Sequence, residues 1–237
     1  MRDVLPDPVF EAVQGHLQSG AEHAQTGWEA ASEDEDTVTG DFGCSLRTGW
    51  KEINSAKGAW RWLVTYKKFR GRGRGAVEKT FCADGIVQVE AFSADGDLHT
   101  KGVLFQAKKA SASQGQDMRN QVRLMESLAP GGSAVFEFGP EGYRAESGTI
   151  VIRDIGSIRE RPLERARPIG RYLSDEFMTC QSGLRGMYFD AVRKVLLIPA
   201  HDTIKAVPLF LRHRLRIDIV HESQFESAKQ GSGVKTA

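Results

Sequence analysis

Two short segments rich in branched and aromatic residues, joined by a polar turn, place the strongest constraint on the fold of this chain. Residues 86–92 are Ile-Val-Gln-Val-Glu-Ala-Phe, and residues 102–108 are Gly-Val-Leu-Phe-Gln-Ala-Lys. Runs of this kind favour β-strands. Between them stands Ser93-Ala-Asp-Gly-Asp, which has the chemistry of a turn. The pattern therefore predicts a β-hairpin.

Helical and extended patterns alternate over the rest of the chain. Apolar residues recur at helical spacing in several segments, and a capping-box pattern places Ser32 at an N-cap with Glu35 three residues later. Helices are expected at residues 8–17, 32–46, 117–129 and 172–180. Strands are expected at residues 60–66, 134–138, 149–155, 193–198 and 214–220. This alternation indicates an α/β protein.

Composition excludes several classes of protein. The 237 residues are 40% hydrophobic and 27% charged, as in an ordinary globular chain. No apolar stretch approaches the roughly 20 residues of a membrane helix, and the N-terminus lacks a secretory signal pattern. A cytoplasmic protein without a membrane partner is expected. Cys44, Cys82 and Cys180 form no CxxC pair, which argues against a disulfide framework or a structural zinc site, and Cys180 is expected to be buried rather than reactive.

The net charge of +1 conceals a segregated distribution. Residues 32–41 are acidic, whereas residues 67–74 are Lys-Lys-Phe-Arg-Gly-Arg-Gly-Arg. Arginines on a glycine-rich loop can follow a phosphate backbone without reading bases. The residues expected to contact nucleic acid are Lys67, Lys68, Arg70, Arg72 and Arg74.

Three polar side chains of the predicted hairpin carry the candidate chemistry. Gln106 and Lys108 share one face of their strand because side chains alternate, and Asp84 stands at the mouth of the preceding strand, where it can meet them. Carboxylate and carbonyl oxygens hold Mg²⁺, and a lysine beside them can orient a water or stabilise developing charge. The combination suits metal-assisted attack on a phosphodiester.

These residues resemble the PD-(D/E)XK restriction-endonuclease-like superfamily, in the bacterial branch that carries Gln in place of the second acid and occurs among defence-associated nucleases. The resemblance covers residues 32–143 and rests on Glu78, on Ala83-Asp84 and on Gln106-Ala-Lys108. It implies a restriction-endonuclease-like α/β fold, whose central mixed sheet is flanked by helices, with accessory strands in the C-terminal third. It also implies a metal-dependent endonuclease that hydrolyses DNA phosphodiester bonds in anti-phage defence or restriction.

Carried over residue by residue, the resemblance gives each position a role. Asp84 is the central metal ligand, the side-chain oxygen of Gln106 replaces the second carboxylate, and the main-chain carbonyl of Ala107 faces the metal. Lys108 orients the attacking water. Glu35 on the first helix of the motif binds the metal directly or through water.

Some alternatives stay open within this assignment. Glu33, Asp36 and Asp41 compete with Glu35 for the helix position, and Glu90 shares a strand face with Asp84 as a candidate extra ligand. Cys82 stands where the family often has Gly. Because Gln removes one negative charge, metal affinity is expected to be weak, with Mg²⁺ as the cofactor and Mn²⁺ as an alternative.

The chain is expected to contain a helical lead-in at residues 1–31, a nuclease core at 32–148, an accessory part or small subdomain at 149–228 and a flexible tail at 229–237. DNA is the expected partner, and a homodimer or higher oligomer is a further expectation. Two other functions stay open at this point. One is a catalytically silent module that binds nucleic acid or a partner, and the other is a nuclease effector gated by a nucleotide signal or by oligomerisation.

Overall fold

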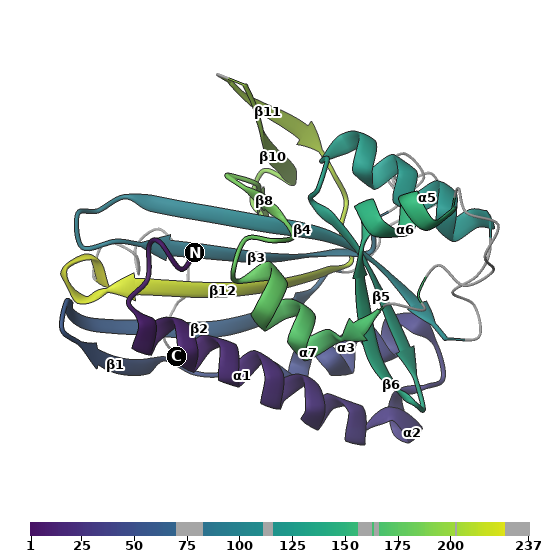
Figure 1. Cartoon of the computed structure of the whole chain (residues 1–237), viewed down its shortest axis with the longest axis horizontal. Coiled ribbons are helices and arrows are strands. Elements are labelled where there is room, and N and C mark those ends of the chain that lie inside the picture. The colour runs from purple at the N-terminus through teal and green to yellow at the C-terminus, as the bar shows by residue number, and fades with distance from the viewer. Residues whose placement is uncertain (70–82, 111–115, 156–162, 164–165, 202, 226–237) are drawn as a thin grey trace.

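Helices and strands alternate along the chain in the computed structural model, which describes residues 1–69, 83–110, 116–155, 163, 166–201 and 203–225 (Figure 1). The helical elements are α1 (Asp7–Thr26), α2 (Trp28–Ala31), α3 (Glu35–Ser45), α5 (Gln116–Leu128), α6 (Gly148–Ile155), α7 (Ile169–Arg171), the π-helix η1 (Tyr172–Phe177) and the 3₁₀-helix η2 (Glu222–Gln224). The strands are β1 (Lys51–Ser55), β2 (Gly58–Lys68), β3 (Gly85–Phe92), β4 (Leu98–Lys109), β5 (Ser133–Gly139), β6 (Gly142–Ser147), β7 (Arg167–Pro168), β8 (Leu184–Arg185), β9 (Tyr188–Asp190), β10 (Val195–Ala200), β11 (Thr203–Pro208) and β12 (His213–His221).

A mixed sheet forms the centre of the molecule. Within the described residues its strand order is β1-β2-β12-β3-β4-β5-β6-β7, and β8 pairs with β4 beside this path. The β3–β4 hairpin is antiparallel, as the sequence predicted, whereas β12 runs parallel to β3 and β4 runs parallel to β5. β9, β10 and β11 form a separate antiparallel sheet. The prediction of an α/β protein with a central mixed sheet and helices around it is confirmed at this level.

The C-terminal third of the chain contributes to both sheets. β12 lies between β2 and β3 in the middle of the central sheet, and its register places His213 beside Gly85 at the start of β3. The same third also supplies the small sheet, whose strands β10 and β11 project from the body in Figure 1. Residues separated widely in sequence therefore meet at the start of β3.

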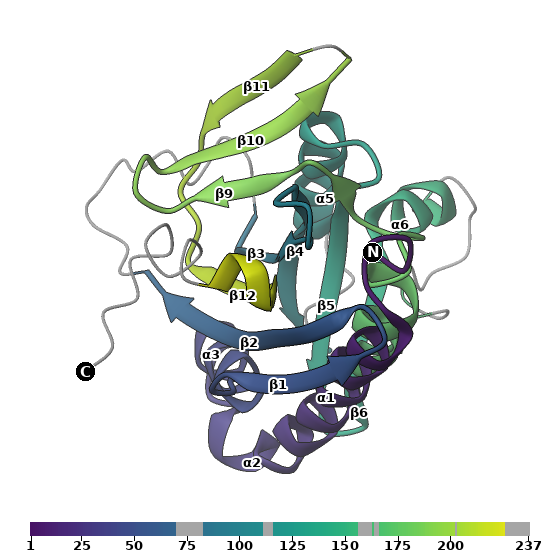
Figure 2. The same cartoon turned by 90° about the vertical axis from the view of Figure 1, so that its left-hand side faces the viewer.

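Apolar cores fill both faces of the central sheet. On one face Phe10 of α1 and Phe42 of α3 pack with Phe136 of β5. On the other face Met118 of α5 packs with Leu196 of the small sheet. Figure 2 shows this layering, with α1, α2 and α3 below the central sheet and β9, β10 and β11 above it. Burial of each large side chain contributes about 1.5 to 3 kcal/mol, so α3 is held firmly against the sheet.

Several elements differ from the sequence expectation. Residues 148–155 form the helix α6 rather than a strand, although Ile150, Val151 and Ile152 favour extended structure. Val151 is fully buried in the core that α5 also lines, so packing between the two helices outweighs local propensity. α1 continues to Thr26, and β1, β6, β9 and β11 were not predicted.

Two further expectations concern the whole chain. The flexible tail expected at residues 229–237 lies outside the described residues. No helix that the structure describes has both the length and the apolar character needed to cross a membrane.

Candidate active site

Asp84 stands directly before β3 and is held by main-chain hydrogen bonds to the strands on both sides. Its N–H donates to the carbonyl of Phe105 on β4 at 2.9 Å. Its own carbonyl accepts from the N–H groups of Arg212 at 2.9 Å and His213 at 3.0 Å. Gly85 follows, and a Cβ at that position would overlap the Phe105 ring, so glycine permits the close approach of β3 and β4. Asp84 is thereby fixed between β12 and β4.

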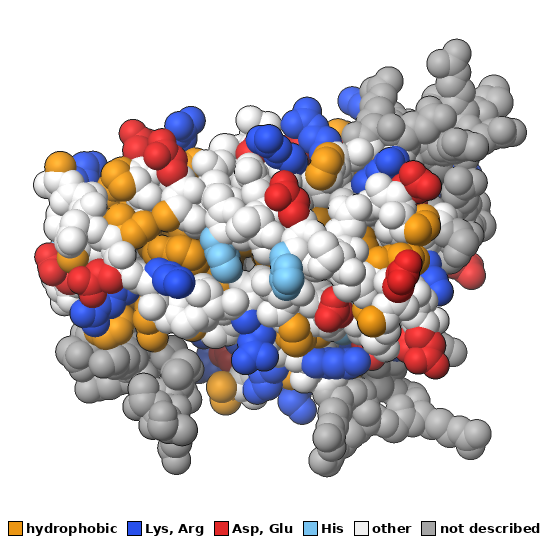
Figure 3. All heavy atoms as spheres, turned by 90° about the horizontal axis from the view of Figure 1, so that it is seen from below, with side chains coloured by type: hydrophobic (Ala, Val, Ile, Leu, Met, Phe, Trp, Pro, Cys, Tyr) orange, Lys and Arg blue, Asp and Glu red, His pale blue; other side chains and the backbone are white. Residues whose placement is uncertain are grey.

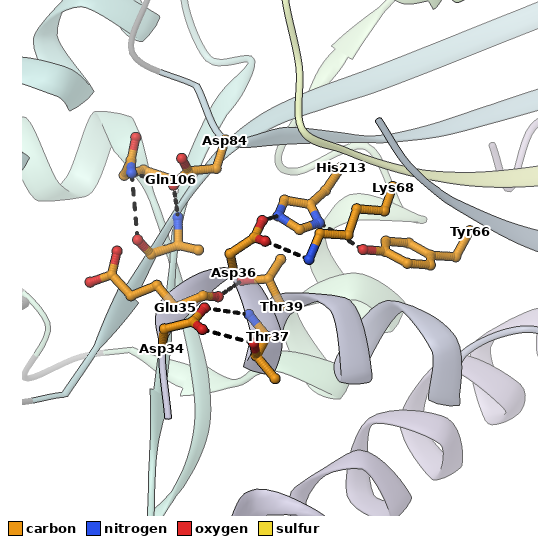
Figure 4. Close-up of polar contacts among 11 residues, drawn as sticks. Asp34, Glu35, Asp36, Thr37, Thr39, Tyr66, Lys68, Asp84, Gln106 and His213 are labelled. Carbon is orange, nitrogen blue, oxygen red and sulfur yellow. Dashed lines mark hydrogen bonds and ion pairs between the residues drawn. The ribbon is translucent and has the colours of Figure 1, made fainter. Parts of the chain in front are cut away.

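The Asp84 carboxylate meets Gln106 and Ala107 of β4 (Figure 4). Its Oδ2 accepts from the main-chain N–H of Ala107 at 2.9 Å and from the side-chain Nε2 of Gln106. The same Nε2 lies 3.5 Å from the carbonyl oxygen of Ala107. Burial raises the pKa of Asp84 to about 6, against the opposing effects of the Ala107 hydrogen bond and the Lys108 charge. The structure thus brings Asp84, Gln106 and Ala107 together, with the amide nitrogen rather than the amide oxygen of Gln106 facing Asp84.

Glu35 reaches the same end of β4 from the first turn of α3. Its Oε2 lies 3.5 Å from Nζ of Lys108, and its Oε1 accepts from the main-chain N–H of Lys109 at 3.4 Å. The side chains of Lys108 and Glu35 are 15% and 34% exposed, so solvent and a ligand can reach the pair. Both charges act on the carboxylate of Asp84. The four side chains that the resemblance assigns to catalysis are therefore gathered at one end of the sheet.

The start of α3 differs from the sequence expectation and explains how Glu35 reaches β4. The N-cap is Asp34, not Ser32, because the Asp34 carboxylate accepts from the N–H of Thr37 at 2.7 Å and from its hydroxyl at 2.9 Å. These hydrogen bonds lower the pKa of Asp34. With Ser32 as the N-cap, Glu35 would turn back toward the cap. With Asp34 as the cap, Glu35 begins the helix and extends to β4 instead.

Asp36 anchors α3 to the sheet through a cluster that the sequence did not predict (Figure 4). Its Oδ1 lies 2.9 Å from Nε2 of His213, its Oδ2 pairs with Lys68, and the Tyr66 hydroxyl lies 2.7 Å from Nδ1 of His213. Burial lowers the pKa of His213 to about 4, although Asp36 acts in the opposite direction, and burial raises the pKa of Tyr66. At neutral pH the His213 ring is therefore uncharged, with Nδ1 facing the Tyr66 hydroxyl and Nε2 facing the Asp36 carboxylate. Asp36 is thus occupied, and Glu35 is the neighbouring acid that meets β4.

The candidate extra ligand Glu90 does not belong to this site. Its carboxylate binds Arg214 at 3.4 Å and Arg216 at 3.1 Å on β12. Glu90 also lies six positions along the chain from Asp84, which is about 20 Å at the rise of a β-strand. Distance and ion pairing therefore separate the two acids.

The residues expected to bind nucleic acid are described in part. Lys67 and Lys68 end β2 and are exposed. Lys68 pairs with Asp36, and Nζ of Lys67 lies 5.3 Å from the centre of the Phe69 ring. Arg70, Arg72 and Arg74 lie outside the described residues. Figure 3 shows charges of both signs spread over one face of the molecule, with Lys and Arg side chains gathered along its lower edge.

The donor atoms of the site suit a hard cation. Within the described ranges, no three side chains of His, Cys, Asp or Glu form a group that could hold a metal ion. The available oxygen ligands are the carboxylates of Asp84 and Glu35 and the carbonyl of Ala107. The side-chain oxygen of Gln106 joins them when the amide group rotates by half a turn. An all-oxygen set of mixed charge fits Mg²⁺ or Mn²⁺ and does not fit zinc.

Comparison with known proteins finds no family model, no curated protein and no solved structure that matches this chain. The resemblance to PD-(D/E)XK nucleases therefore rests on the motif residues alone. What the site does is inferred from its own geometry and chemistry.

Proposed function

We propose that this end of the central sheet is the active site of a metal-dependent nuclease that hydrolyses DNA phosphodiester bonds. The observation that carries the proposal is the position of Nε2 of Gln106, which lies within hydrogen-bonding distance of both Asp84 Oδ2 and the Ala107 carbonyl oxygen. The oxygens of Asp84 and Ala107 thus converge on one point, which the partly positive amide group of Gln106 occupies. A divalent cation can take the same place between the two oxygens. The paired side chains of Lys108 and Glu35 stand beside it.

Each residue of the site has a separate task in this proposal. A bound Mg²⁺ or Mn²⁺ supplies Lewis-acid polarisation of the phosphate. Asp84 and Ala107 hold the cation with oxygens that already converge, and Gln106 joins them by turning its amide group over. Lys108 orients the attacking water and stabilises the charge that develops on the phosphate. Glu35 holds the Lys108 ammonium at this end of β4.

The substitution of Gln for an acid predicts a weak metal site. Two carboxylates attract a divalent cation more strongly than one carboxylate and a neutral amide. Cleavage should therefore require millimolar Mg²⁺ and proceed better in Mn²⁺, which binds nitrogen and oxygen ligands more tightly. In Gln106→Glu a second carboxylate is restored, and the metal concentration needed for half-maximal cleavage should fall.

Basic residues at the end of β2 and in the sequence that follows it support a polyanionic substrate. Lys67 is exposed at the end of β2, and Arg70, Arg72 and Arg74 follow it in the sequence. Phosphate contacts of this kind give affinity that falls steeply with salt. Replacement of the three arginines by Ala should weaken DNA binding and flatten its salt dependence. The choice of DNA, and a role in bacterial defence, come from the resemblance.

The test is cleavage of supercoiled and linear DNA in Mg²⁺, Mn²⁺ or EDTA. Wild type is compared with Asp84→Ala and Lys108→Ala, and the matched controls are Asp97→Asn and Lys205→Ala, which alter exposed residues away from the site. Metal-dependent cleavage lost in the first pair and kept in the second pair supports the proposal. Cleavage that persists in Asp84→Ala, or in EDTA, contradicts it.

A second function is favoured by one feature of the site. Gln106 supplies a neutral amide where a metal-dependent nuclease of this kind has a second carboxylate, as in a nuclease-like module that binds nucleic acid but does not cut it. The same assay separates the two functions. DNA that is bound but stays intact in every metal favours the binding module.

A further inference from the structure

The candidate active site is assembled from two separate parts of the chain. Asp84, Gln106 and Lys108 belong to the β3–β4 hairpin and the residue before it, whereas Glu35 is carried by the first turn of α3. The contacts of the Glu35 carboxylate to β4 are long, 3.5 Å to Nζ of Lys108 and 3.4 Å to the main-chain nitrogen of Lys109. Contacts of this length are weak. The position of Glu35 therefore depends on what holds the first turn of α3.

His213 of β12 contacts both parts of the site. Its main-chain N–H donates to the carbonyl of Asp84 at 3.0 Å. Its ring Nε2 lies 2.9 Å from Oδ1 of Asp36, which follows Glu35 in the first turn of α3 (Figure 4). The side chain of His213 is only 2% exposed. One buried residue thus joins the strand end beside Asp84 to the helix turn that carries Glu35.

Tyr66 of β2 fixes the His213 ring from its other side. The Tyr66 hydroxyl lies 2.7 Å from Nδ1, and the two rings are stacked with their centres 6.0 Å apart. Tyr66 also packs against α3, because a Cβ at Gly43 would overlap its ring. Contacts at both ring nitrogens hold the imidazole in one orientation. Lys68 also pairs with Asp36, but its side chain is 47% exposed, and exposed ion pairs contribute little to stability.

We propose that His213 is a positioning residue of this site, which holds Asp36, and with it Glu35, in register with Asp84. The inference rests on the proposed nuclease function. Without the contact between His213 and Asp36, the first turn of α3 moves away from β4, and Lys108 loses the carboxylate that keeps its ammonium in place. A displacement of about 1 Å in such a group can lower a rate about 100-fold. His213 itself touches neither the cation nor the substrate.

Three variants of the full chain separate positioning from stability. His213→Leu removes both ring nitrogens and keeps a side chain of similar size in a buried place. His213→Gln keeps a terminal amide that can donate to Asp36. The matched control is His221→Leu, at the other end of β12. There a second buried histidine contacts the Ser223 hydroxyl at 2.8 Å and the Lys57 carbonyl at 3.0 Å.

Steady-state DNA cleavage in Mn²⁺ measures the effect on the site. His213→Leu should lower kcat about 10- to 100-fold and leave the KM for DNA unchanged, because the groups that bind phosphate stay intact. His213→Gln should recover most of this loss, and His221→Leu should cleave at the wild-type rate. A purely structural role would affect both Leu variants alike. An unchanged kcat in His213→Leu, or equal losses in the two Leu variants, overturns the proposal.

Hydrogen exchange distinguishes failure of this inference from failure of the proposed function. Exchange of the main-chain amides of residues 35–43 is followed by mass spectrometry in EDTA without DNA, so it does not depend on cleavage. It should accelerate several-fold in His213→Leu and stay unchanged in His221→Leu. If the wild type does not cleave but this exchange responds to His213→Leu, the proposed function falls and the anchoring of α3 by His213 stands. Unchanged exchange in His213→Leu overturns the inference whatever the cleavage assay shows.

Discussion

Two lysines of the same strand show how differently one type of charge can be used. Lys101 is fully buried, its Nζ donates to the main-chain carbonyl of Phe177, and the ammonium lies 4.7 Å from the centre of the Phe177 ring. Lys108 is partly exposed and lies 3.5 Å from the carboxylate of Glu35, beside Asp84. Only Lys108 can meet a solvent-borne phosphate. Burial against a main-chain carbonyl therefore marks a lysine with a structural role, and partial exposure beside acids marks a lysine suited to catalysis.

The largest effect should separate the two lysines by activity. Lys108→Ala should lower the rate of DNA hydrolysis about 10²- to 10⁴-fold while leaving DNA binding intact, because it removes the group that orients water. Lys101→Met should cleave at the wild-type rate. Single-turnover cleavage assays on both variants measure this. Equal losses in the two variants would mean that the comparison fails.

The next effect is on stability and concerns Asp84. Burial raises its pKa to about 6 from 3.8, so the folded state holds this proton to higher pH than the unfolded chain does. In EDTA, the unfolding free energy of the wild type should therefore decrease as the pH rises from 3.8 to about 6. Asp84→Asn should be more stable than the wild type by about 3 kcal/mol at neutral pH. Urea unfolding of both proteins should show the difference vanish at the acid end of that range. A variant less stable than wild type at neutral pH would contradict the account.

Lys101 should show the mirror image of this behaviour with a smaller effect. Burial lowers its pKa from 10.5 to about 8, so the unfolded chain binds more protons between these values and wild-type stability rises with pH there. Lys101→Met should be more stable than wild type by about 2 kcal/mol at neutral pH, after allowance for the lost bond to the Phe177 carbonyl. Urea midpoints at neutral and alkaline pH measure the gap. A stability difference between Lys101→Met and wild type that grew as the pH rose would contradict this prediction.

The smallest effect tests how α3 presents Glu35 to Lys108. Asp34→Ala removes the N-cap and should cost about 1 kcal/mol of unfolding free energy. Ser32→Ala is the matched control and should change stability by less than about 0.5 kcal/mol, because Ser32 does not cap the helix. Urea denaturation distinguishes the two. A larger cost for Ser32→Ala would restore the capping box.

The local sequence pattern predicted the part of the site that the β3–β4 hairpin forms. The turn after residue 92 determines which residues of two adjacent strands face each other, and Gly85 indeed pairs with Phe105. The approach of Asp84 to Gln106 follows from that register. The helix that carries Glu35 was also predicted, but with Ser32 as its N-cap, whereas the extended backbone of Asp34 and its hydrogen bond from Thr37 make Asp34 the cap.

Contacts between distant segments could not be predicted in this way. β12 enters the sheet between β2 and β3, and this brings His213 to Asp36 and Asp84, although no short-range signal joins these residues. Lys101 is a second case. A strand lysine is normally exposed, and its burial results from η1 and β8, which follow much later in the chain.

The most direct test of the central claim is calorimetric titration of Mn²⁺ into the protein without nucleic acid. If the oxygens of Asp84 and Ala107 form a cation site, wild type should bind one Mn²⁺ with weak affinity, Asp84→Asn should lose that binding, and Lys101→Met should keep it. Gln106→Glu should bind more tightly than wild type, because it adds a carboxylate to the same point. Equal Mn²⁺ binding by wild type and Asp84→Asn, or none by wild type and Gln106→Glu at millimolar concentrations, would contradict the account.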